Sequence, residues 1–304
     1  MSIINIVLII LFSVVFGVIA FGYYLAYTLL KPKQRGKSRT PAEYDLPYED
    51  LYFSSHGKQL HAWLVKQPNA DEPLPLILLL HGWESNAQGM LPHAKFLFDA
   101  GFNLFLFDAR GHGDSEPIDY MSLVRFTDDA ENALVYLESR SDVDSQKLAL
   151  FGHSMGGAST IIIGVRHPEI KAVVVSSTYA FFDLMINDMF SARGIPRWPF
   201  GPLLKFFWQL KLNVDVQAWS PGHNIGKIKA PLFLAFGDKD DVLSLRHFDI
   251  LWNSVSAMIR QKILVIGGTH RNLYDFPEYR IAVTGFLSQH FNKPIRKESY
   301  EKVV

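Results

Sequence analysis

The apolar residues of this chain follow three patterns, and each predicts a different kind of element. Residues 3–30 carry no charged side chain, and as a helix they would be roughly 42 Å long, enough to cross a hydrocarbon core of about 30 Å. After residue 48, two stretches alternate apolar and polar residues on either side of the letters HGK, which predicts a hairpin of two strands. From residue 74, short apolar runs alternate with longer mixed segments.

These runs are typical of strands that are buried on both faces of a sheet. Their order along the chain is LPLILLL, FNLFLFD, KLALFG, KAVVVSS, APLFLAFG and QKILVIGG. Because the intervening segments are long enough for crossover helices, the order predicts an α/β fold with a mostly parallel central sheet flanked by helices. One such segment, 127–140, has four apolar residues on a single helical face: Ala130, Ala133, Leu134 and Leu137. Its acids are expected in the first turns of that helix: Asp128, Asp129 and Glu131.

One segment, 178–229, breaks the alternation because it is rich in large apolar residues and in proline. We interpret it as a mostly helical cap insertion over the strand ends; ordinary helices covering the sheet are the alternative. Four of its residues are candidates for a substrate pocket: Phe181, Phe182, Met185 and Trp208. The whole chain then divides into four parts: a transmembrane anchor (1–30), a basic, proline-bearing linker (31–47), an α/β domain (48–292) that includes the cap insertion (178–229), and a charged C-terminal tail (293–304).

The N-terminal apolar segment favours a retained membrane anchor over a cleaved signal peptide. It has no basic start, no short apolar core and no evident small-residue cleavage site. Tyr23, Tyr24 and Tyr27 suit a membrane interface. The stretch KPKQRGKSR that follows is basic, which predicts a single-pass protein with its globular part in the cytoplasm. The same stretch could also be a solvated linker that touches anionic headgroups.

Composition narrows the function classes. The chain has 30 Lys and Arg against 30 Asp and Glu, so it offers no long-range attraction to nucleic acid. It has no cysteine, which excludes disulfides, thiolate metal sites and a cysteine nucleophile. Neither a metal nor an organic cofactor is expected. The expected partners are a small-molecule or lipid substrate and the membrane.

The stretch FGHSMGGAS contains a candidate nucleophile, Ser154. It reads G-x-S-x-G, with a buried-strand run before it and a possible helix after it, the setting that a nucleophile elbow requires. The flanking glycines Gly152 and Gly156 fit a turn too tight for Cβ atoms. A small residue in a glycine-rich loop is the alternative.

A serine needs a base and an orienting acid, and both are expected after later strands. One run ends in three acids, Asp238, Asp240 and Asp241, and the next ends in His270. The resulting order Ser, Asp, His is the one that this fold uses.

An oxyanion also needs two backbone N–H groups. Met155, directly after the serine, is expected to supply one, and Trp83, in the loop after the first buried strand, the other. Chain order makes His81, in the same loop, a brace rather than a base.

Five stretches together resemble the serine hydrolases of the α/β-hydrolase superfamily: HGWESN, FDARGHGDS, GHSMGG, GDKDDV and GGTHRNL. The resemblance extends from about residue 48 to about residue 291. By the family pattern the acid stands three residues after the glycine, which selects Asp240, and Asp108 and Arg110 brace a structural loop. Haloalkane dehalogenases and epoxide hydrolases of this fold attack with aspartate, whereas Ser154 stands here. With its apolar N-terminus, the chain looks like the membrane-anchored hydrolases grouped near serine aminopeptidases and monoacylglycerol lipases.

The expected activity is therefore hydrolysis of a carboxylic ester, on an apolar or lipid-like substrate, through an acyl-enzyme. An amide, a peptide or a thioester would use the same triad, so these substrates stay open. A noncatalytic binding module on the same fold is the alternative of another class.

Overall fold

An eight-stranded sheet forms the centre of the protein in this computed structural model, which describes residues 1–68, 72–256 and 260–292. The strand order is β1-β2-β4-β3-β5-β6-β7-β8. β2 is antiparallel to β1 and β4, and the pairings from β4 to β8 are parallel. The predicted hairpin and all six buried runs are confirmed as strands: β1 Tyr48–Ser55, β2 Lys58–Val65, β3 Leu76–Leu80, β4 Asn103–Phe107, β5 Leu148–His153, β6 Ala172–Ser176, β7 Leu232–Gly237 and β8 Arg260–Val265.

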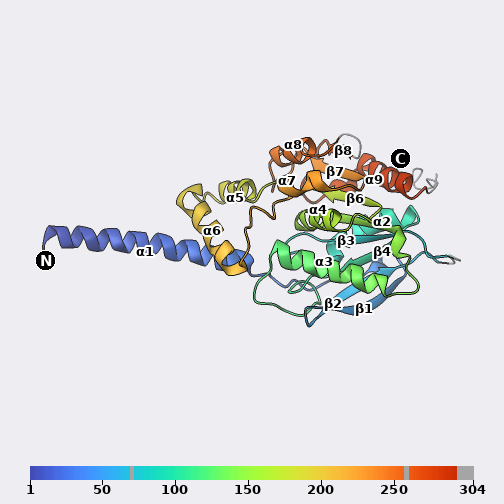
Figure 1. Ribbon diagram of the computed structural model, residues 1–304, viewed down its shortest axis with the longest axis horizontal. Coiled ribbons are helices and arrows are strands. Elements are labelled where there is room, and N and C mark those ends of the chain that lie inside the picture. Colours follow the sequence, from blue (N-terminus) through green and yellow to red (C-terminus); the bar gives the residue numbers. More distant parts are fainter. Residues whose placement is uncertain (69–71, 257–259, 293–304) are drawn as a thin grey trace.

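Helices cover both faces of the sheet (Figure 1). α3, α4 and α8 share one apolar cluster with the sheet, and α2 and α9 share another. Side chains of β3 alternate between them, Leu78 toward the first cluster and Leu79 toward the second, as a strand buried on both faces requires. The helices are α1 Ile3–Leu30, α2 Leu91–Asp99, α3 Leu123–Glu138, α4 Met155–Arg166, α5 Phe182–Ser191, α6 Arg197–Leu212, α7 Pro221–Asn224, α8 Arg246–Asn253 and α9 Pro277–His290.

The helix expected over 127–140 exists, but it begins earlier, at Leu123. The Ser122 hydroxyl caps it by accepting the N–H of Arg125, a cap that the apolar periodicity did not show. Because the helix begins earlier, Asp128 and Asp129 lie in its second turn, and its first turn holds no acid.

α1 projects away from the sheet, and its N-terminus is the far end of the molecule (Figure 1). Its most apolar 18 residues have a mean hydropathy of 3.0, and none of them is buried. Among the residues that the structure describes, the last turns of α1 are the part that touches the rest of the chain, through an apolar cluster with α5 and α6 that includes Leu25, Ala26, Phe182 and Leu204. α5, α6 and α7 fall within 178–229, so that segment is helical, as expected.

Residues 31–39, expected as a linker, lie along the loops that follow β3 and β4. The Lys37 ammonium contacts Asp108 at 3.0 Å and Asp114 at 2.9 Å, and its side chain is only 6% exposed. Asn86 donates to the carbonyl oxygen of Arg35. Lys37 therefore departs from the expectation of a solvated linker, because two carboxylates draw it into the domain. The charged tail expected at 293–304 lies outside the described residues.

Candidate active site

Ser154 stands on the sharp turn between β5 and α4. Its backbone φ of 55° and ψ of −117° are strained for a residue with a side chain. A Cβ on Gly152 would collide with the carbonyl group of Gly156, and one on Gly156 would collide with the carbonyl oxygen of Leu80. The turn is held from behind, because the Ser154 N–H donates to Ser176 O at 2.9 Å. The two glycines are thus needed for the turn that presents Ser154.

The turn after β8 brings His270 to this serine. The distance from His270 Nε2 to Ser154 Oγ is 3.1 Å, and that from His270 Nδ1 to Asp240 Oδ2 is 2.8 Å. The side chains of His270 and Asp240 are 6% and 1% exposed. The other carboxylate oxygen of Asp240 accepts the N–H groups of Val242 and Leu243. Serine, imidazole and carboxylate therefore form one hydrogen-bonded chain whose last member is fixed by backbone donors.

The three acids that the sequence left as alternatives have different partners. Asp238 accepts the N–H of Gly267 at 2.6 Å, which fixes the turn after β8. Asp241 contacts the backbone N–H of His270 at 3.4 Å. Among the described contacts of these acids, only that of Asp240 reaches the imidazole.

Trp83 and Met155, expected as the oxyanion donors, lie on either side of Ser154. A Cβ added to Gly82 would lie 3.1 Å from Ser154 Cβ, which shows how closely the loop after β3 approaches. Within the described residues, no hydrogen-bond acceptor is found for the backbone N–H of Trp83 or of Met155. Because Met155 is also the first residue of α4, the helix dipole adds positive potential at this point.

Two further histidines surround the site without joining the hydrogen-bonded chain. His81 contacts Gly82 O through Nδ1 and accepts the Ala109 N–H at Nε2, and burial lowers its pKa to about 3, so it is neutral and braces the loop. The His153 ring centroid lies 4.9 Å from that of His270. Burial, and then the charge that His270 can carry, lower the pKa of His153 well below its ordinary value. The sequence analysis did not predict the contact between His153 and His270. The position of His153 directly before Ser154 was the one signal in the sequence that could have indicated it.

Asp108 and Arg110, expected as braces, lie away from the triad. Asp108 accepts the N–H of Ala87 in the loop after β3. Burial opposes its ionisation, but hydrogen bonds and the Lys37 charge hold the pKa of Asp108 below its usual range. Arg110 Nε lies 2.6 Å from Asp129 Oδ1, and burial still raises the pKa of Asp129 to about 6. Both side chains support loops around the site.

Around Asp108, three side chains form a group that resembles a metal site. His61, Asp108 and Asp114 each direct a ligand atom toward a common point. The ammonium of Lys37 lies among them, in contact with all three. Since this cation already neutralises the carboxylates, the cluster is an anchor for residues 31–39.

The four candidate pocket residues separate into two groups. Phe182 and Trp208 pack edge to face, with their ring centroids 5.1 Å apart, and Trp208 Nε1 donates to Ala26 O in α1 at 2.8 Å. Phe181 packs on His223 and lines a cavity of about 570 Å³ between α5, α6 and α8. Met185 is half-buried between the sheet cluster and the cluster with α1. The structure thus directs Phe182 and Trp208 to α1, and neither has a described contact with Ser154.

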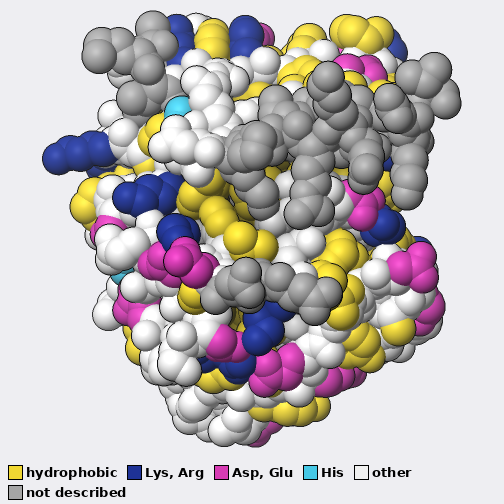
Figure 2. Space-filling view, turned by 90° about the vertical axis from the view of Figure 1, so that its right-hand side faces the viewer, with side chains coloured by type: hydrophobic (Ala, Val, Ile, Leu, Met, Phe, Trp, Pro, Cys, Tyr) yellow, Lys and Arg dark blue, Asp and Glu magenta, His cyan; other side chains and the backbone are white. Residues whose placement is uncertain are grey.

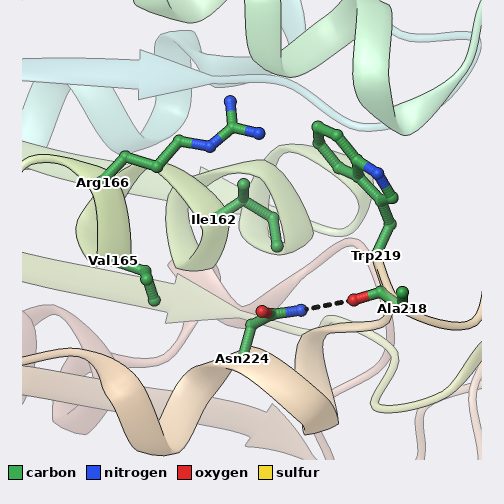
Figure 3. A pocket seen from close by; sticks show the side chains of 6 residues that line it. All are labelled: Ile162, Val165, Arg166, Ala218, Trp219 and Asn224. Carbon is green, nitrogen blue, oxygen red and sulfur yellow. Dashed lines mark hydrogen bonds between the residues drawn. The ribbon is translucent and has the colours of Figure 1, made fainter.

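A second cavity, of about 230 Å³, opens between α4 and α7 (Figure 3). Arg166 stacks on Trp219 there, with 4.9 Å from the guanidinium carbon to the ring centroid, and Ile162 forms its floor (Figure 3). Ile162 is eight positions beyond Ser154 along α4, or roughly 12 Å. This cavity is separate from the triad.

Fold and site together define an α/β hydrolase: a mostly parallel sheet with a serine on the strand-to-helix turn, and an acid and a histidine after the last two strands. The family model for serine aminopeptidases, S33, matches residues 71–221. The uncharacterised protein YfhR of Escherichia coli K12 is 30% identical over 224 residues, 72% of each chain. The chain therefore belongs to the S33 serine aminopeptidase family of α/β hydrolases.

Solved structures agree with this fold. The esterase Pf2001 of Pyrococcus furiosus superposes with a TM-score of 0.70 at 22% identity, over 86% of this chain and 98% of the esterase. A membrane phospholipase A, described as a bacterial virulence factor, superposes with a TM-score of 0.61 at 16% identity, over 96% of this chain and 100% of the phospholipase. At these identities, the likeness concerns the fold.

Proposed function

We propose that this protein is a membrane-anchored serine hydrolase that cleaves carboxylic esters of apolar or lipid-like acyl groups. The observation that carries the proposal is the hydrogen-bonded chain from Ser154 through His270 to Asp240. Two backbone N–H groups without described acceptors, those of Trp83 and Met155, lie beside it. These are the parts that acyl transfer to water requires.

In the proposed reaction, Ser154 Oγ attacks the acyl carbonyl carbon while His270 Nε2 takes the hydroxyl proton. Negative charge develops on the carbonyl oxygen, where the N–H groups of Trp83 and Met155 stabilise it. His270 then gives its proton to the leaving alkoxide. A water molecule attacks the acyl-enzyme carbonyl with His270 again as base; the bond from the acyl carbon to Ser154 Oγ then breaks, His270 returns the proton to Oγ, and the carboxylic acid departs. Asp240 holds the imidazole in one tautomer and stabilises its protonated form.

The membrane part of the proposal rests on α1. Its apolar length supports a bilayer span, and its contact with the cap through Trp208 and Ala26 supports a segment that stays with the mature protein. The basic residues at 31–39 favour a cytoplasmic position for the domain. An apolar ester drawn from the bilayer is the substrate class that such an anchor favours.

The family description favours one second candidate, hydrolysis of an amide or peptide bond by the same triad. The two candidate activities, ester hydrolysis and amide or peptide hydrolysis, differ in the leaving group of the substrate. The test is to present full-length protein in detergent with a p-nitrophenyl ester, a p-nitroanilide and a thioester that share one acyl chain, and then to lengthen that chain.

We expect the ester to be hydrolysed fastest and the rate to rise with chain length. The Ser154→Ala variant is expected to lose turnover of all three substrates. Faster cleavage of the anilide would favour the peptidase, and equal rates for Ser154→Ala and the parent would contradict the mechanism. No turnover of any substrate by folded protein would support the noncatalytic module.

A further inference from the structure

The cap carries a second apolar surface, outside α1. Large apolar side chains are exposed along α6 at Trp198 (79%), Phe206 (59%) and Leu210 (70%). Pro202 is also exposed, so residues 202, 206 and 210 follow the four-residue spacing of a single helix ridge. Trp198 precedes this row, at a kink where its backbone is not helical (φ −100°, ψ 132°). We call these four exposed residues, Trp198, Pro202, Phe206 and Leu210, the α6 ridge. An apolar ridge of this length on a soluble surface would stay exposed to water at a cost in free energy.

The position of the α6 ridge relative to α1 indicates what covers it. None of residues 3–20 is buried, and as helix they rise about 27 Å, close to the roughly 30 Å of a hydrocarbon core. Contact with the cap begins immediately afterwards, where Phe21 packs on Phe200 at 5.0 Å and a Cβ on Gly22 would meet Leu203. If residues 3–20 fill the bilayer core, α6 begins at the level of the headgroups.

The packing of α6 makes the α6 ridge continuous with α1. Phe206 packs on Phe207 at 5.4 Å, and Phe207 packs on Tyr23 at 5.5 Å. Tyr23 and its neighbour Tyr24 are both exposed, and tyrosines are enriched at the interface of a bilayer. Figure 1 shows the turn between α5 and α6 as the part of the cap that extends furthest along α1 toward the N-terminus.

The charge of this region suits phosphate groups. Residues 191–214 contain no acid. Arg193 and Arg197 are exposed, and neither has an ion pair among the described residues. The two lysines of α6 are paired with acids of other segments, Lys205 with Asp183 and Lys211 with Asp119. The opposite end of the molecule differs, because basic, acidic and apolar side chains are intermixed over its visible described surface (Figure 2). Tryptophan flanked by arginine is typical of a helix that lies in the headgroup layer.

We propose that the α6 ridge lies in the headgroup layer of the bilayer that α1 spans, so that the cap is held at the membrane by two helices. This inference rests on the proposed anchoring by α1. A bilayer, rather than a second protein, is the occupant because the ridge begins where the span-length part of α1 ends. The contact would fix the tilt of the domain and keep the cap in touch with the lipid that the proposed substrate leaves.

The absence of cysteine allows a direct test. Single variants Phe206→Cys and Leu210→Cys of the full chain are labelled with a nitroxide and reconstituted in vesicles of phosphatidylcholine and phosphatidylglycerol. Ile10→Cys, near the middle of the span-length part of α1 (residues 3–20), reports the anchor. Val135→Cys is the matched control, since this α3 residue is 62% exposed but lies on the body of the domain. Relaxation by oxygen, which concentrates in lipid, is compared with relaxation by a water-soluble nickel chelate.

We expect the ratio of oxygen to nickel relaxation at positions 206 and 210 to be several-fold higher than at position 135 and to approach that at position 10. A high ratio at position 10 with values at 206 and 210 equal to that at 135 would overturn the α6 contact and leave the anchor intact. A low ratio at position 10 would refute both. Exclusion of both reagents at 206 and 210 would mean burial against protein and would also overturn the proposal.

Discussion

The edge of the sheet that carries Ser154, Asp240 and His270 differs from the cap in how it is held. At the edge, polar groups fix each other over short distances, such as the 2.8 Å between His270 and Asp240, and backbone donors fix the carboxylate. In the cap, apolar contacts and the Trp208 indole hydrogen bond join α5 and α6 to the end of α1. Polar contacts there are spread over the surface, such as the Ser244 N–H that donates to Asp188 of α5. In terms of the proposed function, this difference means that the chemical step and the delivery of substrate can be changed separately. Changes at the edge should affect every ester, whereas changes in the cap should leave the chemical step intact.

The largest effect on turnover is expected from a change at Asp240, the carboxylate that contacts His270. Asp240→Asn keeps the size of the side chain but removes the negative charge beside His270 Nδ1, and the wrong imidazole tautomer becomes favoured. We expect kcat/KM for a soluble p-nitrophenyl ester to fall about 10⁴-fold. Asp238→Asn is the matched control, because its amide oxygen can still accept the Gly267 N–H.

The rate of the control should stay within about tenfold of the parent, since only the Asp240 charge stabilises the imidazolium that forms in the reaction. Steady-state kinetics on both variants provide the measurement. Equal losses in the two variants would contradict the assignment of Asp240 as the orienting acid.

The next largest effect is expected on the free energy of unfolding at acid pH, because buried histidines pack near the edge of the sheet that carries Ser154. Burial lowers the pKa of His93 to about 3. Below about pH 6.5 the unfolded chain binds a proton at this histidine while the folded chain does not, so stability falls as the pH drops from about 6.5 toward 3. His93→Phe, which also removes a buried nitrogen without a described partner, should reduce that slope by up to about 1.4 kcal/mol per pH unit.

Denaturant unfolding between pH 4 and 7 measures this slope. His167→Gln serves as the control. The carboxylates of Glu131 and Glu169 raise the pKa of His167, so both the folded and the unfolded chain are protonated there well below pH 6. That variant should keep the slope of the parent over the acid range. An unchanged slope in His93→Phe would show that its imidazole is not held neutral.

The smallest effect is expected in the cap. Trp208→Phe removes the hydrogen bond from the indole N–H to Ala26 O, which should lower the free energy of unfolding by about 1 kcal/mol. Turnover of a soluble ester should not change. Trp219→Phe is the control, because no acceptor for the Trp219 indole is found in the described part of the chain. Thermal unfolding in detergent and steady-state kinetics are measured for both variants. A loss of turnover in Trp208→Phe would link the cap to the chemical step and contradict the comparison.

Much of the sheet could be predicted from the sequence because its central strands, β3, β4 and β6, are buried on both faces, so their letters form uninterrupted apolar runs. β1 is exposed on one face, and alternation predicted it instead. The order of candidate triad residues was also readable, because parallel strands end at one edge and the turns after β5, β7 and β8 must meet there. Selecting Asp240 needed the family pattern, since three acids follow β7 and nothing in their spacing tells which one turns inward.

Other features depend on contacts between distant parts of the chain. The burial of Lys37 requires Asp108 and Asp114, which lie more than 70 positions away. The docking of α6 on α1 joins Trp208 to Ala26, and local periodicity carries no information about such a pair. The sequence pattern of residues 31–39 is that of a free basic linker, and only the fold supplies its partners.

The central claim is that Ser154 is an activated nucleophile, and reaction with a fluorophosphonate tests it most directly. The full-length protein is treated with the probe in detergent, digested, and mapped by mass spectrometry, beside His270→Ala. The account predicts a single adduct on the peptide that contains Ser154, formed rapidly in the parent and far more slowly in His270→Ala. Folded parent protein that forms no adduct at Ser154, or forms it as fast without His270, would contradict the account.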